Sequence, residues 1–442
     1  MGVRPHVVIV GAGFGGLAAA KHLDKLPVDV TLIDRQNFTT FQPLLYQVAT
    51  SGLNDADVAH PVRGLFHRQH NLHVRQGEVV AVDWDRRVVR FADRREIAYD
   101  HLVLAVGAVA TWFGVSGAQE HGLPLYTLPD AVSLRNHVIE RFEAADADPS
   151  LIDDGELTFV VVGGGPTGVE TAGALAELFA VVFRQDYPTI PVSRARVVLV
   201  EARDALLEPF SPSSRRAALE TLQARQVEVR LGEAVDEVAP DHVRFASGEV
   251  LPTRTVIWAA GVRANPLPGA IDLPTTRAGR VEVAPDLSVP GHPGVWAIGD
   301  VAAAPGRRGQ PLPQLAPVAM QAGAHVARQI GRILDARPTQ PFRFRDKGTM
   351  ATIGRKSAVA ELPPGIHLRG AIAWLAWLGL HLLYLAGLRN RLSVLLNWFW
   401  AYVTWDRGPR IILRLGSDEA RAAATDGDGA VTRPGRSAAS GP

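Results

Sequence analysis

Cysteine is absent from this sequence, since none of its 442 residues is Cys. This excludes a disulfide framework, a thiolate zinc site, a cysteine-ligated iron–sulfur cluster, a cysteine nucleophile and a dithiol redox pair. We therefore expect no metal site. Any redox chemistry that the chain performs must use a bound cofactor.

An excess of charge of either sign is also missing. Lys and Arg number 46 and Asp and Glu number 45, so the formal net charge is +1. Composition therefore implies no general attraction to nucleic acid. The hydrophobic share of 47% is enough for two or three domains with ordinary cores. The first residues lack a hydrophobic stretch with a cleavage site, so we expect the chain to stay in the cytoplasm or on a membrane facing it.

The N-terminal part of the chain has the pattern of a dinucleotide-binding unit. The run Val7–Val10 predicts a buried parallel strand, and GAGFGG follows it from Gly11 to Gly16. A helix is predicted over 17–26 and a second strand over 28–33, which ends on Asp34. The order of strand, glycine turn, helix, strand and acid is typical of a βαβ unit that holds a dinucleotide.

The same order recurs about 150 residues later. Phe159–Val162 precedes GGGPTG from Gly163 to Gly168, and a strand over 196–200 ends on Glu201. The longer gap before this acid must hold a longer helix or a loop. These repeats predict an α/β fold with two Rossmann-like dinucleotide-binding domains, each with a parallel sheet and a small antiparallel meander.

A late strand over Val295–Ile298 ends on Gly299 and Asp300 and has no clear counterpart in the second copy. We infer that the second domain interrupts the first. The predicted domains are a first nucleotide-binding domain of residues 1–113 and 291–342, a second of 114–290, a helical C-terminal membrane-association domain of 343–415 and a disordered tail of 416–442.

The two glycine turns have the chemistry that a pyrophosphate needs. Glycine lets the backbone approach the phosphates, while free amides and the positive end of a helix dipole face their oxygens. Asp34 and Glu201 are expected to accept hydrogen bonds from a ribose, and Glu201 would repel a 2′-phosphate, which favours NADH over NADPH. Arg203 weakens that preference because its cation can lean toward a phosphate. A purely structural glycine turn is the alternative for each copy.

The absence of cysteine gives the two sites a joint interpretation. Two nucleotide sites in a chain without thiols suggest a flavin in one domain and a nicotinamide in the other, so that a hydride passes between them. Asp300 is then a candidate ligand for a hydroxyl group of the flavin nucleotide. Its alternative is an ordinary turn residue after Gly299.

Two uncharged runs, Gly370–Leu388 and Leu392–Trp405, flank Arg389-Asn390-Arg391 and hold five of the nine tryptophans. The first run has 19 residues, enough for one spanning helix. Tryptophan prefers the membrane interface, so Trp374 and Trp377 suit helices that lie in the head-group layer. We expect peripheral, monotopic attachment to the cytoplasmic face of the cell membrane. A spanning anchor and a buried core or dimer helix are the alternatives.

These motifs resemble those of the type II NADH:quinone oxidoreductases, single-subunit flavoproteins of respiratory membranes. The resemblance runs from about Val7 to Leu413. It rests on VIVGAGFGGL from Val8, FQPLLYQVAT from Phe41, VVGGGPTGVE from Val161, AIGD from Ala297, LPQLAPVAMQAG from Leu312, KGTMATIGR from Lys347 and LRNRLSVLLNWFW from Leu388.

The resemblance implies FAD in the first domain, NADH in the second, and transfer of electrons to a membrane quinone, menaquinone or ubiquinone, without proton pumping. The implied FAD-binding residues are Gly11, Gly13, Phe14, Gly15, Gly16, Asp34, Arg35, Gln42, Val79, Gly107, Asp300 and Ala316. The implied NADH-binding residues are Gly163, Gly165, Thr167, Gly168, Glu201 and Gly261. Glu170 is the implied catalytic residue, because the family places this acid near the nicotinamide and the flavin. From the residues alone, Glu170 equally suits a dipole-stabilising acid at the second position of a helix.

One departure from the family pattern concerns the quinone. Where the family often has Ala-Gln with a second glutamine four residues later, this chain has Ala316-Pro317 and keeps only Gln321. Proline is tolerated in the first turn of a helix, so a helix start here still presents free amides to the flavin. The quinone-site candidates are therefore Gln42, Pro317 and Gln321.

Two other functions fit part of the sequence. An FAD-dependent reductase that passes electrons to a ferredoxin or rubredoxin would need a docking patch and no membrane segment. A non-catalytic, NADH-sensing membrane flavoprotein is compatible with both glycine turns. Disulfide reductases and sulfide:quinone oxidoreductases share the architecture but use cysteine pairs, which the composition excludes. The sequence leaves a homodimer open.

Overall fold

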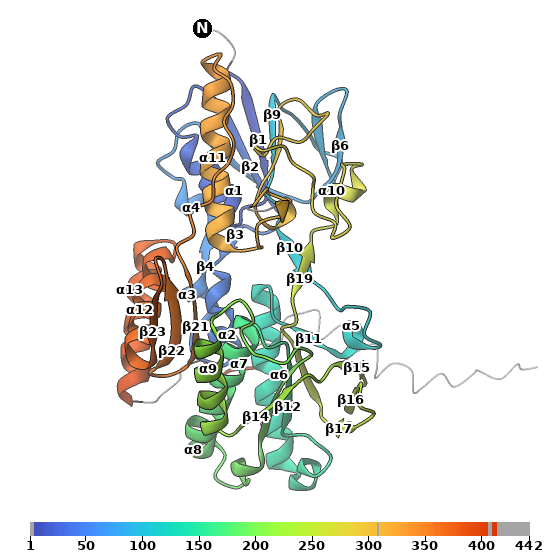
Figure 1. The fold of residues 1–442 in the computed structure, drawn as a ribbon, viewed down its shortest axis with the longest axis vertical. Coiled ribbons are helices and arrows are strands. Elements are labelled where there is room, and N and C mark those ends of the chain that lie inside the picture. The colour runs from blue at the N-terminus through green and yellow to red at the C-terminus, as the bar shows by residue number, and fades with distance from the viewer. Residues whose placement is uncertain (1–3, 307–308, 405–408, 413–442) are drawn as a thin grey trace, which may run out of the picture.

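The computed structural model describes residues 4–306, 309–404 and 409–412. The predicted tail, residues 416–442, lies outside these residues. Figure 1 shows two lobes stacked along the long axis of the molecule, with a smaller C-terminal unit packed beside them.

The first lobe is built on a five-stranded parallel sheet in the order β20-β9-β1-β2-β5. Its elements are β1 (His6–Val10), α1 (Phe14–His22), β2 (Asp29–Asp34), β5 (Leu72–Gln76), β9 (His101–Leu104), β20 (Val295–Ala297) and α11 (Ala316–Leu334), with a meander of β6 (Val79–Asp83), β7 (Val88–Phe91) and β8 (Glu96–Ala98). Val7 and Ile9 of β1 pack toward α1 and α11, while Val8 and Val10 pack toward the meander. Strand β1 is apolar throughout because both faces of the sheet are covered.

The second lobe repeats this plan in the order β11-β18-β12-β13-β14. Its elements are β11 (Leu123–Pro124), α6 (Leu128–Ala147), β12 (Thr158–Val162), α7 (Pro166–Glu177), β13 (Arg196–Glu201), α9 (Pro212–Ala224), β14 (Val227–Leu231) and β18 (Thr255–Trp258), with a meander of β15 (Val235–Val238), β16 (His242–Phe245) and β17 (Val250–Pro252). The predicted α/β fold with two dinucleotide-binding folds and antiparallel meanders is confirmed.

The position of the late strand explains how the chain is organised. Strand β20 pairs in parallel with β9 at the edge of the first sheet, as an interrupted first domain requires. The interpretation that this strand has no counterpart was wrong, because β11 holds the equivalent edge position beside β18 in the second sheet. Strand β11 has only two residues and precedes its sheet in the chain, so it left no pattern to recognise. The residue boundaries of the domains stay predictions.

The long gap before Glu201 holds both a longer helix and a loop. Helix α7 continues without a break as a π-helical turn, Leu178–Phe183, and then as α8 (Arg184–Asp186). A loop and the short helix Val192–Arg194 follow before β13. Pro166–Asp186 is the one described helical stretch long and apolar enough to cross a membrane, but 72% of its apolar 18-residue window is buried inside the protein. It is therefore a core helix of the second lobe.

The two lobes are joined by an antiparallel pair, β10 (Ala108–Ala110) and β19 (Val262–Ala264), which Figure 1 shows between them. Strand β10 follows Gly107 and β19 follows Gly261, which have φ angles of 70° and 98°. Gly107 ends Leu104-Ala105-Val106-Gly107, and Gly261 ends the corresponding Trp258-Ala259-Ala260-Gly261 in the second copy. Equivalent segments of the repeat therefore pair with each other.

The C-terminal unit consists of β21 (Thr349–Gly354), β22 (Ser357–Leu362), β23 (Ile366–Arg369), α12 (Gly370–Tyr384) and α13 (Leu388–Thr404). It packs on α3 (Asp55–Val58) and on α7 and α9 of the second lobe. Trp377 and Trp398 also contact Tyr46 and Gln47 of α2 (Leu45–Ala49). The other short elements in this part of the chain are β3 (Phe38–Thr40), the 3-10 turn Gln42–Leu44, β4 (Ala59–Pro61) and α4 (Val62–Leu65). The remaining short helices are α5 (Ala118–His121), α10 (Leu267–Ala270), Pro149–Ile152 and Gly299–Val301.

The first uncharged run does not form one long helix. Helix α12 has 15 residues and ends at Tyr384, and Gly387, at φ 81°, lies in the connection to α13. At 1.5 Å per residue, α12 is about 22 Å long, whereas the hydrocarbon core of a bilayer is about 30 Å thick. This geometry argues against the alternative of a spanning anchor.

Candidate functional site

The glycines of the first turn have different roles. Gly11 has φ 107°, and a Cβ there would overlap the carbonyl oxygen of Ala105. A Cβ on Gly16 would overlap the carbonyl oxygen of Gly11. Gly13, directly before α1, has no protein atom within 4 Å of its Cβ position. The fold itself needs Gly11 and Gly16, while Gly13 leaves an open cradle at a helix N-terminus, where a pyrophosphate binds.

The second glycine turn divides the roles in the same way. Gly163 has φ 113° and lies against Ala259, and a Cβ on Gly168 would overlap the carbonyl oxygen of Gly163. Gly165, directly before α7, has no protein atom within 4 Å of its Cβ position. Thr167 is exposed beside it. Each lobe therefore has an open cradle that fits a dinucleotide.

The two acids shape the turns. Asp34 accepts hydrogen bonds from the backbone N–H groups of Ala12 at 2.6 Å and Gln36 at 2.8 Å. Glu201 accepts from Gly164 at 2.6 Å and from Arg203 at 2.9 Å. A carboxylate accepts about four hydrogen bonds, so each acid keeps capacity for a ribose hydroxyl.

Arg203 is held by another acid. Its guanidinium forms an ion pair with Glu208, and both side chains are largely exposed. The guanidinium of Arg203, which the sequence suggested could contact a 2′-phosphate, therefore already has an ionic partner. This pairing restores part of the preference for NADH that Glu201 alone predicts.

Asp300 lies in a turn that packs on the start of α11. The turn needs Gly299, which has φ 73° and whose Cβ would lie 3.3 Å from that of Ala319. Burial raises the pKa of Asp300, and the nearby positive charge of Arg280 opposes the shift. Ala316 begins α11 with Pro317 in the first turn, as expected.

Other predicted flavin-site residues lie around this turn or farther along the sheet. A Cβ built on Gly15 would lie 3.3 Å from the side chain of Ile298. The glycine therefore permits close packing of α1. Gly107 has open space around its Cβ position. Arg35 is exposed directly after Asp34, and Val79 is buried at the start of β6.

Tyr126 lies among the candidate site residues, and the sequence did not predict it. It lies between β11 and α6. Burial, and to a smaller extent the negative charge of Asp300, raise the pKa of its hydroxyl group to about 12. Hydrogen bonds with the Ala108 backbone and the Gln42 side chain oppose the shift. Tyr126 thus brings together Gln42 and Asp300, two candidates that lie far apart in the sequence. The chain offers no motif around Tyr126 that marks this role.

Glu170 is buried where α7 meets the C-terminal unit. Its carboxyl group accepts a hydrogen bond from the backbone N–H of Thr352 in β21 at 3.2 Å. Burial raises its pKa to about 8; the Thr352 bond and the nearby indole of Trp377, whose N–H forms no regular hydrogen bond, oppose the shift. The interpretation of Glu170 as an acid at the second helix position was wrong. Helix α7 begins four residues earlier, and a neutral buried carboxyl group gains nothing from the dipole.

An aromatic row connects α12 with the first glycine turn. Trp377 stacks on His381 with ring centroids 4.0 Å apart. His381 meets the edge of Phe41 at 6.0 Å, and Phe41 meets Phe14 at 5.8 Å. Burial lowers the pKa of His381 to about 4, so the ring is neutral at physiological pH. The row runs from beside Glu170 to the turn that holds Gly13.

Trp377 is buried and does not face the membrane interface as the sequence suggested, and Trp398 of the second apolar run is buried as well. Trp377 is 1% exposed and Trp398 is 4% exposed. The Trp398 indole donates a hydrogen bond to the side chain of Gln47 at 2.8 Å. Both side chains instead attach the C-terminal helices to the rest of the protein.

Comparison with known proteins agrees with this geometry. The model of the pyridine nucleotide-disulphide oxidoreductase family matches residues 5–323, and that of the NDH2 C-terminal domain matches 347–404. The chain is 39% identical over 429 residues to the type II NADH:quinone oxidoreductase NdhA of Mycobacterium tuberculosis, covering 93% of this chain and 90% of that one. The chain belongs to the type II NADH:quinone oxidoreductases. Family membership implies binding of FAD and NADH.

Further type II NADH:quinone oxidoreductases are also similar. The enzyme of Staphylococcus aureus is 30% identical over 366 residues, covering 80% of this chain and 89% of that one. The solved structure of NDH2 from Plasmodium falciparum in complex with NADH has a TM-score of 0.85 at 19% identity, covering 92% of this chain and all of that chain. The sulfide:quinone oxidoreductase of Aquifex aeolicus shares the fold with a TM-score of 0.68 at 18% identity and 95% coverage of both chains.

The structure places the three quinone-site candidates of this type II oxidoreductase differently. Gln42 lies beside Tyr126, and Pro317 lies in the first turn of α11. The side chain of Gln321 donates to the carbonyl oxygen of Arg345 at 2.9 Å and accepts from its N–H at 3.0 Å. A quinone would have to displace both bonds, so Gln42 is the better placed glutamine.

Proposed function

We propose that the chain binds one FAD in the first lobe, oxidises NADH bound in the second, and reduces a membrane quinone, menaquinone or ubiquinone, to the quinol without pumping protons. The observation that carries the proposal is the contact of Glu170 with Trp377. This contact joins α7, the helix that follows the second glycine turn, to the apolar helix α12. It would thus link the nicotinamide site to the surface that we place at the membrane.

The residues of the chain bind and orient the nucleotides. The amides at Gly13 and Gly165 receive the pyrophosphates, while Asp34 and Glu201 fix the ribose ends. Asp300 and the first turn of α11 support the flavin end of the first site. FAD, when bound, supplies the two-electron chemistry that takes a hydride from NADH and passes both electrons to the quinone. Positioning of the two substrates supplies most of the rate.

Glu170 supplies a proton-holding group in this scheme. With a pKa of about 8, its carboxyl group is mostly protonated at neutral pH. It lies in a buried place bounded by Thr352 and Trp377. We assign Glu170 the role of holding a proton during turnover, which the quinol requires.

Peripheral attachment to the membrane is supported by the outer faces of α12 and α13. Both helices have one buried side, which includes Trp377 and Trp398, and one exposed apolar side. The exposed apolar side chains are Ile372, Leu375, Leu380, Leu383, Leu388, Leu392, Leu395, Leu396, Phe399, Trp400 and Val403. A helix pair with such a face suits the plane of the interface, here on the cytoplasmic side.

Separate half-reactions test this function. Anaerobic addition of NADH to the FAD-loaded protein is expected to bleach the flavin absorbance, and addition of a quinone is expected to restore it. A flavin that stays oxidised with NADH would contradict the nicotinamide half of the proposal. A flavin that NADH reduces but that only a ferredoxin or rubredoxin reoxidises would contradict the quinone half.

A further inference from the structure

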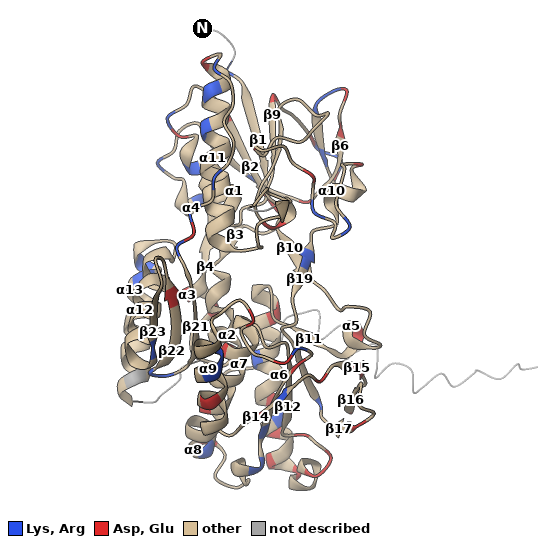
Figure 2. Cartoon of the chain, viewed as in Figure 1, with Lys and Arg blue, Asp and Glu red and all other residues tan. Residues whose placement is uncertain are grey.

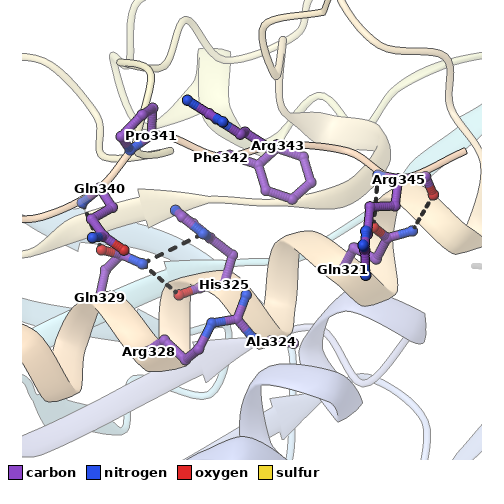
Figure 3. Close-up of a pocket in the computed structure, with 10 residues that line it drawn as sticks. All are labelled: Gln321, Ala324, His325, Arg328, Gln329, Gln340, Pro341, Phe342, Arg343 and Arg345. Atoms are coloured by element: carbon purple, nitrogen blue, oxygen red, sulfur yellow. Dashed lines mark hydrogen bonds between the residues drawn. The ribbon is translucent and has the colours of Figure 1, made fainter.

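A basic cavity lies outside the nucleotide sites, between α11 and the segment that leads to the C-terminal unit. We call this segment, residues 335–348, the linker. The cavity has a volume of about 540 Å³, within the range of small-ligand sites. In Figure 3, α11 forms one wall and the linker forms the other.

The charge of the cavity is of one sign. Arg328 comes from α11, and Arg343 and Arg345 come from the linker. None of the ten residues that line the cavity is acidic. Within the described part of the chain, none of the three guanidinium groups forms an ion pair with a carboxylate. All three side chains are exposed, so solvent screens their repulsion, and an anion that bridged them would add charge-assisted hydrogen bonds.

The frame of the cavity is fixed by hydrogen bonds that do not use these cations. Gln321 binds the backbone of Arg345 through both of its polar atoms, at 2.9 and 3.0 Å. At the other end, the backbone N–H of Gln340 donates to the side chain of Gln329 at 2.8 Å. The linker is therefore fastened to α11 on both sides of the arginines, which leaves the guanidinium groups available.

His325 forms part of the floor. Its side chain is 5% exposed, and its ring packs on Phe342 at a centroid distance of 5.4 Å. Its Nε2 atom is buried without a regular hydrogen bond, although the backbone atoms of Gln340 and Asp286 lie near the ring. The charge of Asp286 acts on His325, and its carboxylate already accepts from the N–H and the hydroxyl group of Ser288.

From this arrangement we propose that the cavity binds a phosphate-bearing anion, which would fasten the linker to α11. Guanidinium groups hold phosphate oxygens through paired, charge-assisted hydrogen bonds, and three arginines line the cavity. The phosphate belongs either to a lipid head group or to a soluble phosphate compound. Arg332 lies farther along α11. Figure 2 shows further Lys and Arg residues on the loops beside this helix, which would attract either one.

The test compares the FAD-loaded wild type with two charge-matched double variants. Arg328→Gln with Arg343→Gln removes two cavity cations. Arg184→Gln with Arg216→Gln removes two exposed cations from α8 and α9, outside the cavity. None of the four residues lies in the nucleotide cradles, so both variants should keep their flavin content and their NADH oxidation.

The first arm uses inorganic phosphate at constant ionic strength and follows Tm. Saturating phosphate should raise the Tm of the wild type and of the control variant by about 2–4 °C and should leave the cavity variant unchanged. The second arm measures sedimentation with phosphatidylcholine vesicles that contain phosphatidylglycerol. The cavity variant should bind these vesicles about tenfold more weakly than the control variant does.

The two arms distinguish the source of the phosphate. A difference in the first arm alone assigns the cavity to a soluble phosphate compound, and a difference in the second arm alone assigns it to a lipid head group. Differences in both arms support the site with either source. If the two double variants behave alike in both arms, the proposal is overturned.

Discussion

The carboxyl group of Glu170 accepts a hydrogen bond of 3.2 Å from the backbone N–H of Thr352, which joins the second lobe to the C-terminal unit. Glu170 belongs to the helix of the second glycine turn, and Thr352 belongs to the sheet that carries the apolar C-terminal helices. The acid is thus fixed by the unit that we place at the membrane.

Replacement of Glu170 by Gln should remove one pH dependence of stability. The folded-state pKa of about 8 lies above the ordinary value of 4.5. The native state therefore binds more protons than the unfolded state between these values, and stability falls as the pH rises from about 4.5 to about 8. In Glu170→Gln, the unfolding temperature should therefore fall less between about pH 4.5 and pH 8 than it does in the wild type. An unchanged slope would contradict a raised pKa.

The same variant should also lose activity. Without a titratable group, NADH:quinone turnover should fall by about 100-fold, within the usual range for general acid–base groups. The decrease of wild-type activity above about pH 8 should disappear. Flavin content, measured by absorbance, should stay equal to that of the wild type. Equal turnover in the two proteins would show that Glu170 has a structural role only.

Valine at Gly13 or at Gly165 should separate the two nucleotide sites. Neither position has a protein atom within 4 Å of its Cβ, so both variants are expected to fold. Gly13→Val should be purified without FAD, because the side chain fills the cradle. Gly165→Val should retain FAD but lose most of its affinity for NADH. Absorbance and NADH titration check both. As a control, Gly16→Val should fail to fold, because its side chain would overlap Gly11.

Release of Arg203 should raise the use of NADPH. In Glu208→Gln the guanidinium loses its ionic partner and becomes available to a 2′-phosphate. We expect kcat/KM for NADPH to rise about fivefold with little change for NADH, as for one exposed charge contact. The double variant Arg203→Gln with Glu208→Gln is the control and should lose the gain. An equal gain in the double variant would assign the effect to Glu208 alone.

Asp57 should be needed for docking of α13. Its buried carboxylate accepts hydrogen bonds from Ser393 at 2.6 Å and Asn397 at 2.7 Å. Asp57→Ala leaves both donors unpaired and should destabilise the protein by about 3 kcal/mol. Urea unfolding and faster proteolysis near α13 check this. The exposed Asp24→Ala provides the control and should unfold like the wild type.

The parts of the fold that could be predicted from the sequence are those with local patterns. The strand, glycine turn and acid around Gly11 and Asp34, and their second copy at Gly163 and Glu201, depend on neighbours in the chain. Strand β11 could not be predicted because two residues carry no periodicity. Its edge position is fixed only by pairing with β18.

The parts of the site that escaped prediction depend on tertiary contacts. Tyr126 becomes a neighbour of Gln42 and Asp300 only when both lobes are assembled. Trp377 and Trp398 stand in an apolar run that resembles an interface helix, yet their indoles pack inward. Periodicity marks α12 and α13 as apolar but does not say which face the protein covers.

The central claim is that electrons from NADH reach a lipid-soluble quinone. Its most direct test is anaerobic turnover on vesicles in which menaquinone or ubiquinone is the sole acceptor, with NADH consumed and quinol formed measured together. We expect one quinol for each NADH oxidised by the wild type and about 100-fold slower turnover by Glu170→Gln. Oxidation of NADH without formation of quinol, or no oxidation with either quinone while a ferredoxin or rubredoxin is reduced, would contradict it.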